Sequence, residues 1–398
     1  MSFNLEKISD VDVIHWAAAH GKHKIVKCLI EDNTDVNAIR DDSITPLHQA
    51  SINGHLNVVE CLIENGAKLN IIAPGTCNGT ALHVAAYTGR QNIVECLIKN
   101  RANVNSTIKG SLTPLHQASF TGHENVVECL IKNGAKVDSM TNDYGTPLNI
   151  AVYNGHQNVV ECLIRNGANV NSMDKDWVTP LYHASSNGHQ NIVECLIKNG
   201  ANVNLMTQVY GTPLHIATYL GHQNVVECLI KNGANVNSVY KEGTPLHVAA
   251  MHGHENVVEC LVKNGANINS KEALDNSTPL HWAAYNGHEN IVACLVKNGA
   301  NLNLKDIINC TPIHRAVNNG HYNIVNFLIN NGDTNSPYNY PCTFCRQPSN
   351  GIYAFLPCGH ALTCRNCCQF FVIKKKKGCS SCEKKVTNFK QIFLTKSD

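Results

Sequence analysis

The sequence predicts a mainly α-helical repeat solenoid, followed by a small cysteine-rich module of α+β structure. Three observations lead to this prediction. A Thr-Pro-Leu-His motif recurs with a period close to 33 residues. An apolar stretch at helical spacing, of the type NVVECLI, follows each copy of the motif. After residue 335 the composition changes, and closely spaced cysteines replace the repeats. One repeat cannot bury its own apolar face, so neighbouring repeats must stack.

The repeats make up about ten units over residues 1–335. A degenerate first copy begins near Val13, and the clearer copies begin at Thr45, Thr80, Thr113, Thr146, Thr179, Thr212, Thr244, Thr278 and Thr311. The period and the Thr-Pro-Leu-His signature resemble the ankyrin repeat. This resemblance implies a helix-turn-helix and a projecting β-turn in each unit. It also implies an array that selects a protein partner and catalyses nothing.

Each part of the repeat has a physical reason. Thr45 suits the N-cap of a short first helix, and Pro46 suits its first turn, where a missing N–H costs nothing. Gly54 permits the left-handed residue that reverses the chain. The second helix then presents Val, Cys, Leu and Ile on one side, and Gly66 ends it.

Two kinds of residue recur inside the repeats and invite a chemical interpretation. Nine cysteines share one place in the second helix: Cys28, Cys61, Cys96, Cys129, Cys162, Cys195, Cys228, Cys260 and Cys294. Packed helices lie about 8–10 Å apart, too far for disulfides between these positions, so we expect small core residues and not a redox or metal ladder. The histidines of the motif predict a hydrogen-bonded structural ladder. HENVVE lacks the second histidine of a metalloprotease, because Val127 stands there.

The positions that vary between repeats are candidates for binding. One lies at the end of the first helix, where the sequence has Ile52, Tyr87, Phe120, Tyr153, Ser186, Tyr219, Met251, Tyr285 and Asn318. Stacked repeats would align these side chains on the inner face, and aromatic and Met residues are typical interface anchors. The projecting turns could extend this stripe through Tyr144, Trp177, Tyr210 and Tyr240. Alternatively, the rings only cover the helix of the neighbouring unit.

Composition excludes several classes of protein. The net charge of +2 offers no general attraction to nucleic acid or to a membrane surface. No stretch reaches the eighteen or so apolar residues of a membrane span, and the N-terminus has no secretory pattern. We therefore expect a cytoplasmic protein with reduced thiols. The run Lys374–Lys377 predicts a solvated loop, with a nuclear import signal as the weaker alternative.

The module after the linker at residues 336–341 predicts two zinc sites. Residues 342–382 contain eight ligand candidates in closely spaced pairs: Cys342, Cys345, Cys358, His360, Cys364, Cys367, Cys379 and Cys382. Eight N and S donors fill two tetrahedral Zn²⁺ sites and leave no place for water, so the sites would be structural. A redox pair at Cys379 and Cys382 is the alternative. Cys368 breaks the two-residue spacing, and we expect a spare thiol there.

The order of these ligands resembles the RING finger of ubiquitin ligases, in which the pairs interleave. The resemblance implies that one zinc is held by Cys342, Cys345, Cys364 and Cys367. It implies that the other is held by Cys358, His360, Cys379 and Cys382. The stretch FLPCGHALTCRNC and the tail at 383–398 are similar to the inhibitor-of-apoptosis type of RING. In that type the tail forms a strand that pairs two RINGs or contacts ubiquitin, which implicates Val386, Phe389, Ile392 and Phe393.

By the same resemblance, the RING would dock a ubiquitin-conjugating enzyme (E2). Phe344 matches the family's apolar contact to the E2, and Phe370 or Phe371 would supply the second contact. Alternatively, these rings only pack the small zinc core. Three departures weaken the match. Ser380 replaces a common proline, and Glu383 stands where many RINGs have an arginine that bridges E2 and ubiquitin. The loop with Lys374–Lys377 is also longer than in the inhibitor-of-apoptosis relatives.

The sequence thus predicts a RING-type E3 ubiquitin ligase with two Zn²⁺ ions. The array would bind a protein substrate, and the RING would position a ubiquitin-charged E2 without forming a covalent intermediate. Two alternatives remain. One is a non-catalytic scaffold whose zinc module only dimerises or docks a partner. The other is a ligase subunit that is active only beside a second RING.

Overall fold

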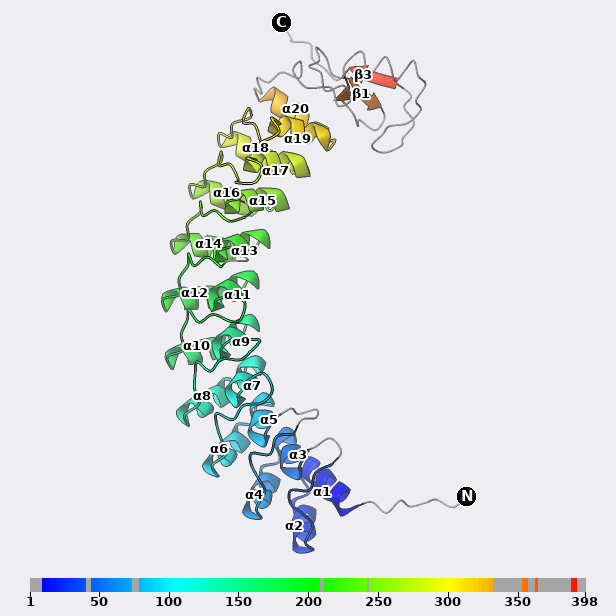
Figure 1. The fold of residues 1–398 in the computed structure, drawn as a ribbon, viewed down its shortest axis with the longest axis vertical. Coiled ribbons are helices and arrows are strands. Elements are labelled where there is room, and N and C mark those ends of the chain that lie inside the picture. Colours follow the sequence, from blue (N-terminus) through cyan, green and yellow to red (C-terminus); the bar gives the residue numbers. More distant parts are fainter. Residues whose placement is uncertain are drawn as a thin grey trace, which may run out of the picture. The chain divides into compact units, whose positions relative to one another are not determined.

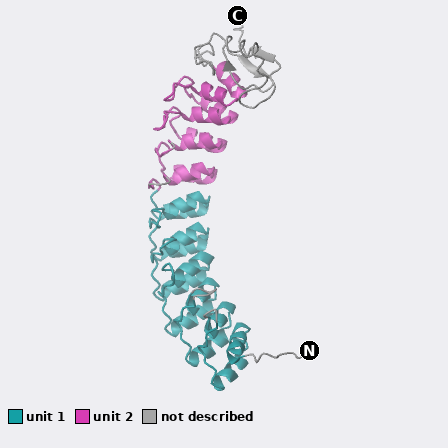
Figure 2. Cartoon of the chain, turned by 45° about the vertical axis from the view of Figure 1, so that its right-hand side comes forward, with its two compact units in different colours: residues 1–202 teal, residues 203–398 magenta. Residues whose placement is uncertain are grey.

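The computed structural model describes residues 9–40, 44–73, 79–207, 211–241, 243–331, 353–356, 362–363 and 388–391. In this part of the chain, twenty short helices follow one another as ten antiparallel pairs, and three short strands come after them. The predicted mainly helical solenoid is confirmed. The chain divides into two compact units, residues 1–202 and 203–398, which are described separately below (Figure 2).

Unit 1 contains six helix pairs. Its first helices are α1 (Asp10–Ala19), α3 (Pro46–Asn53), α5 (Ala81–Tyr87), α7 (Pro114–Thr121), α9 (Pro147–Tyr153) and α11 (Pro180–Ser186). Its second helices are α2 (His23–Glu31), α4 (Leu56–Glu64), α6 (Gln91–Lys99), α8 (Glu124–Lys132), α10 (Gln157–Arg165) and α12 (Gln190–Lys198). Each first helix packs on the next first helix, and each second helix on the next second helix, so the unit has two helical layers (Figure 1).

Unit 2 contains four further helix pairs with the same two layers (Figure 1). Its first helices are α13 (Pro213–Tyr219), α15 (Pro245–His252), α17 (Pro279–Asn286) and α19 (Pro312–Asn318). Its second helices are α14 (Gln223–Lys231), α16 (Glu255–Lys263), α18 (Glu289–Lys297) and α20 (Tyr322–Asn330). Among the described helices, none has the length and apolar character that crossing a bilayer requires.

The helix boundaries follow the sequence signals. Thr45 is the N-cap of α3 with extended backbone (φ −100°, ψ 162°), and Pro46 is the first helical residue. Gly54 follows the helix in the left-handed conformation at φ +85°, which lets the chain turn back into α4. The same order of N-cap threonine, proline and terminal turn recurs in nearly every later pair.

The core lies between the two layers of each unit. In the second repeat, Leu47 and Ala50 of α3 and Val58, Val59 and Leu62 of α4 are at most 1% exposed. Their equivalents in the following repeats are buried as well. Each fully buried Val or Leu side chain contributes roughly 1.5–3 kcal/mol of hydrophobic free energy, so stacking supplies most of the stability.

Asparagine side chains at the start of the projecting turns link each repeat to the next. The Nδ2 of Asn105 donates a hydrogen bond to the carbonyl of Gly134 at 2.9 Å, and its Oδ1 accepts one from the amide of Lys136 at 2.9 Å. Asn171 makes the same two bonds to Gly200 and Asn202. Backbone groups that the helices leave unpaired at these turns are thereby satisfied.

The three strands of the C-terminal region form one sheet in the order β2–β1–β3. They are β1 (Tyr353–Leu356), β2 (Leu362–Thr363) and β3 (Asn388–Gln391). Both pairings are antiparallel, and Phe389 of β3 stands opposite Phe355 of β1. A strand was predicted in the tail, and β3 lies there and pairs with β1 of the same chain. The predicted pairing of two RINGs through this tail stays a prediction. The predicted zinc ligands, the E2-contact residues, Val386, Ile392 and Phe393 lie outside the described residues.

Candidate protein-binding surface

The variable position at the end of each first helix is fixed by hydrogen bonds from the following repeat. The Nε2 of His156 donates to the carbonyl of Phe120 at 3.0 Å, and the Nδ2 of Asn187 donates to that of Tyr153 at 2.7 Å. In unit 2, His254 bonds the carbonyl of Tyr219 in the same way at 2.9 Å. These hydrogen bonds fix the backbone at this position. They involve only its carbonyl group, so they place no requirement on the identity of its side chain.

In unit 1, this position presents aromatic rings to solvent. Tyr87 and Phe120 are each about half exposed, and Tyr153 is 59% exposed. The rings of Tyr87 and Phe120 stack with their centroids 6.4 Å apart, so these two consecutive repeats share one aromatic surface. Ile52 is half-buried, so it belongs only partly to this surface.

In unit 2, the corresponding side chains are more tightly packed. Tyr219 is 45% and Tyr285 39% exposed, and Met251 is half-buried. The Tyr219 ring meets the ring of His252 edge-on at 4.5 Å, and Tyr285 meets Trp282 edge-on at 5.9 Å. The sequence left two interpretations of these rings: a stripe that binds a partner, or a cover for the neighbouring repeat. In unit 2 the rings contact neighbouring side chains and also face solvent, so each interpretation has a physical basis.

Among the described residues of unit 1, the most exposed aromatic side chains lie in the projecting turns. Trp177 is 68% and Tyr144 61% exposed. Tyr240 differs, because it is half-buried and its ring lies edge-on to His215 at 6.0 Å. Tyr210 lies outside the described residues.

Several exposed apolar side chains lie outside the positions predicted from the sequence. Trp16 of α1 is 49% exposed, and Leu274, Ile307 and Ile308 in two turns of unit 2 are 63–73% exposed. The amide of Ile307 donates to the carbonyl of Asp275 at 2.7 Å, which joins these two turns. A search for aliphatic residues in the turns, instead of aromatic residues alone, would have found the second group.

The repeated histidines are structural, as predicted. The Nδ1 of His116 accepts hydrogen bonds from the amide and the hydroxyl of Thr113, at 3.1 and 2.8 Å. Its Nε2 therefore carries the proton and donates to the carbonyl of Ser139 in the next repeat at 3.0 Å. Burial lowers the pKa of His116 to about 4, so the ring is neutral at pH 7. A ring with both nitrogens occupied has none left for a metal.

Two repeats of unit 1 lack this histidine, because Asn149 replaces it in α9 and Tyr182 in α11. In α11, the next residue, His183, bonds Asp174 of the preceding turn at 2.7 Å. Burial raises the pKa of the Asp174 carboxyl, but hydrogen bonds from His183 and the amide of Val178 outweigh it and hold the pKa below its ordinary value. Asp174 is therefore an anion that anchors both α11 and its own turn.

The cysteines of the second helices are mostly core residues. Five are buried, whereas Cys96, Cys195 and Cys294 are half-buried. The prediction is wrong for Cys28, which is exposed. These side chains lie on the side of the preceding second helix, and α2 is the first second helix of the described residues. Burial raises the pKa of thiols such as Cys162, which disfavours the thiolate that metal binding and redox chemistry need.

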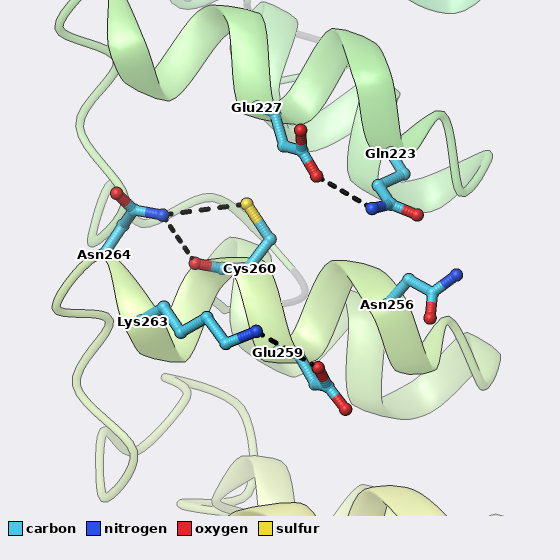
Figure 3. A pocket seen from close by; sticks show the side chains of 7 residues that line it. All are labelled: Gln223, Glu227, Asn256, Glu259, Cys260, Lys263 and Asn264. Carbon is cyan, nitrogen blue, oxygen red and sulfur yellow. Dashed lines mark hydrogen bonds and ion pairs between the residues drawn. The ribbon is translucent and has the colours of Figure 1, made fainter.

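A shallow pocket of about 340 Å³ lies between α14 and α16 in unit 2 (Figure 3). Most of its polar side chains bond one another (Figure 3). Gln223 donates to Glu227 at 2.8 Å, Lys263 to Glu259 at 3.3 Å, and Asn264 to the carbonyl of Cys260 at 2.8 Å. Burial raises the pKa of the Cys260 thiol. The pocket therefore presents no activated nucleophile, base or ligand set.

No group of three or more His, Cys, Asp or Glu side chains that could hold a metal occurs in the described part of the chain. The eight predicted zinc ligands lie outside it. Their donor set, seven thiolates and one imidazole, is nonetheless the chemistry that structural Zn²⁺ prefers.

These features define a class of protein: a stacked helical solenoid that presents variable side chains on a uniform frame. The model of the family "Ankyrin repeats (3 copies)" matches residues 3–73, 71–141, 115–207, 201–272 and 246–338. The chain therefore belongs to the ankyrin repeat family.

A solved structure agrees with this assignment. The crystal structure of the human ASB11 ankyrin repeat domain is 29% identical and superposes with a TM-score of 0.51. The match covers 55% of this chain and 98% of that domain. A search of curated proteins gave no significant match to this sequence.

Proposed function

We propose that this chain is a RING-type E3 ubiquitin ligase whose ankyrin array binds a protein substrate. The observation that carries the binding role is the row of exposed aromatic side chains at the ends of α5, α7 and α9. Stacking of the repeats does not require rings at this position, since Ser186 occupies it in α11. Exposed aromatic residues on a rigid frame are suited to anchoring a protein partner.

The ligase role is supported by the sequence of the C-terminal module. Cys342, Cys345, Cys364 and Cys367 would hold one Zn²⁺, and Cys358, His360, Cys379 and Cys382 the other. Zinc would supply the folding free energy of this short segment, which has few apolar residues of its own. Phe344, together with Phe370 or Phe371, would form the apolar contact to an E2. Catalysis would then consist of orienting the thioester-linked ubiquitin.

The test is ubiquitin-chain formation by the purified full chain with activating enzyme, a panel of E2 enzymes and ubiquitin. We expect chains with at least one E2, and a loss of about tenfold or more in Phe344→Ala, since E2 docking depends on a few buried apolar contacts. Zinc content is measured for both proteins, and two ions per chain are expected in each. Inactivity across the panel with two zinc ions bound would contradict the ligase role.

A scaffold without ligase activity is the second candidate, and Glu383 favours it. A carboxylate at this place repels groups that an arginine would attract, and Lys384 lacks the planar fork of arginine. Substitution Glu383→Arg separates the two candidates. A ligase weakened by this residue gains activity, whereas a scaffold stays inactive. A module that only dimerises, through Val386, Phe389, Ile392 and Phe393, would still sediment as a dimer.

A further inference from the structure

Trp177 has a backbone conformation that tryptophan rarely adopts. Its φ is +59°, in the left-handed region. Ser111, Asn276 and Asn309, at the same place in three other projecting turns, also have a positive φ, between +58° and +63°. Asparagine is enriched in this region, whereas a bulky side chain there is an outlier. Because the side chain of Trp177 is 68% exposed, packing provides little compensation.

The fold does not require a tryptophan in this turn. Asp174 Oδ1 accepts hydrogen bonds from the amides of Asp176 and Val178, both at 2.9 Å. In the last repeat, Asp306 Oδ1 accepts the same two bonds, from Ile308 and Cys310 at 3.0 and 2.8 Å. The second turn is closed equally well around Asn309. Strained residues of this kind cluster at binding sites, where the strain persists because the side chain is used.

Trp177 belongs to a group of three exposed aromatic residues. Its turn is joined to the turn of Tyr144 by the ion pair between Lys175 and Asp143, with Nζ and Oδ1 3.3 Å apart. The third ring, Tyr153, meets His183 edge-on at 5.7 Å, and His183 bonds Asp174 in the turn of Trp177. Tyr144, Tyr153 and Trp177 are each about 60% exposed or more, and we call them, together with Asp176, the Trp177 surface.

This surface has an acidic balance. The two turns, residues 139–145 and 172–178, contain three aspartates and one lysine. Lys175 pairs with Asp143, and Asp174 pairs with His183. The carboxylate of Asp176 is exposed and makes no ion pair with any described residue. The neighbouring helices α9 and α11 have no Lys, Arg, Asp or Glu.

We infer that the Trp177 surface binds a segment of the protein substrate in which an arginine is flanked by apolar residues. A guanidinium can stack on the face of an indole or phenol ring and also pair with a carboxylate, which a single apolar or acidic side chain cannot do. The apolar residues beside it cover Tyr144 and Tyr153. The inference rests on the proposed function, in which the array binds a substrate.

The test begins with stability, measured by thermal unfolding of the full chain. Trp177→Asn relieves the strain, so we expect its melting midpoint to be unchanged or up to about 3 °C higher. The reciprocal variant Asn309→Trp places the strain in the matching turn, and we expect a midpoint lower by about 1–3 °C. An unchanged midpoint in Asn309→Trp would overturn the premise of strain.

Binding is then measured by selecting a random-peptide phage library against the wild-type chain. We expect an enriched consensus with an arginine between apolar residues. The synthetic consensus peptide should bind Trp177→Asn at least about tenfold more weakly, and Asp176→Asn about three- to tenfold more weakly. Replacement of the arginine in the peptide by glutamine should cost about as much as Trp177→Asn.

Three results would overturn the inference: a consensus without a basic residue, binding to Trp177→Asn within twofold of wild type, or no enrichment over a selection without bait. A peptide that binds elsewhere on the array would leave the general binding role intact. Ubiquitin-chain formation is measured independently, so the ligase proposal and this inference can fail separately.

Discussion

The interior of the repeats and their exposed ends differ in how much they vary from one repeat to the next. Inside, Thr, Pro, Leu and His begin most first helices, and Val, Cys and Leu recur in the second helices. At the exposed end of the first helix, one position holds residues as different as Ser186, Tyr219 and Asn318. Every repeat must stack on its neighbours in the same way, whereas stacking places no such requirement on the exposed end of the first helix.

Exceptions inside the repeats support this distinction. Asn149 replaces the motif histidine in α9, and it keeps the essential bonds. Its Oδ1 accepts from the amide and hydroxyl of Thr146 at 3.1 and 2.7 Å, and its Nδ2 donates to the carbonyl of Ser172 at 3.5 Å. At Asn149, the contact that joins two repeats is therefore retained although the residue differs.

The largest expected effect is that of pH on stability, through the buried histidines of the repeat interior. Burial lowers the pKa of five motif histidines to about 4 in the folded chain: His83, His116, His215, His247 and His314. In the unfolded chain these histidines bind protons near pH 6.5. Their contribution to the free energy of unfolding is therefore fully present above this pH and is lost as the pH decreases towards 4. Each histidine contributes up to about 1.4 kcal/mol per pH unit in this window.

Urea unfolding at a series of pH values measures this dependence. We expect the free energy of unfolding to fall by several kcal/mol between pH 6.5 and pH 4, since five groups titrate together. A constant free energy of unfolding over this range would show that the histidines are not buried as neutral rings.

The next largest effect is expected from a single motif histidine. His247 joins Thr244 to the carbonyls of Ser270 and Ser277, at 3.0 and 3.1 Å. His247→Ala leaves these buried groups unpaired, and we expect a loss of about 3 kcal/mol in urea unfolding. His247→Asn copies the arrangement of Asn149, and we expect a smaller loss of about 1 kcal/mol. Equal losses would mean that the hydrogen bonds contribute little.

Two glycines with the same backbone conformation separate close packing from strain. Gly253 and Gly265 have φ of +80° and +83°, and a side chain at either is strained by about 1–2 kcal/mol. A Cβ on Gly253 would lie 2.7 Å from His288 Cε1, whereas one on Gly265 meets nothing within 4 Å.

We therefore expect Gly253→Ala to lower the free energy of unfolding by about 1–2 kcal/mol more than Gly265→Ala. Thermal and urea unfolding of the two variants give this difference directly. If the two alanines cost the same, the histidine ring of the next repeat does not confine this turn.

The smallest effect is expected at the asparagines that link the projecting turns. Asn105→Asp keeps the acceptor for the Lys136 amide but loses the donor to the Gly134 carbonyl, at the solvent-exposed edge of the array. We expect a loss of about 0.5–1.5 kcal/mol in urea unfolding. The chain itself has an aspartate at this place, Asp138, which accepts from the amide of Asn169 at 3.0 Å. A loss above about 3 kcal/mol would mean that the asparagine hydrogen bonds between the projecting turns contribute as much as those of a motif histidine.

Much of the array could be predicted from the sequence, because caps, turns and apolar spacing act within one repeat. Thr45, Pro46 and Gly54 have the expected conformations, and the histidine ladder has the expected role. Properties that depend on the neighbouring repeat were harder to predict. Cys28 is exposed because no described second helix packs on that side of α2, although its own repeat resembles the others.

The candidate surface could be predicted only in part. Tyr87, Phe120 and Tyr153 could be predicted from their position in the repeat. The partial burial of Ile52 and Met251 could not, because it depends on adjacent side chains. The left-handed backbone of Trp177 left no sequence signal, since tryptophan is not typical of that conformation. It follows from the hydrogen bonds of Asp174 to its own turn.

The most direct test replaces three rings of unit 1 together, Tyr87→Ser, Phe120→Ser and Tyr153→Ser, as at Ser186. Proteins captured by the wild-type chain from cell extract are identified, and their purified forms are titrated against both chains. We expect affinity to fall at least about tenfold while the melting midpoint shifts by less than about 2 °C. Unchanged affinity, or a midpoint lowered by more than about 5 °C, would mean that the rings serve packing and not partner binding.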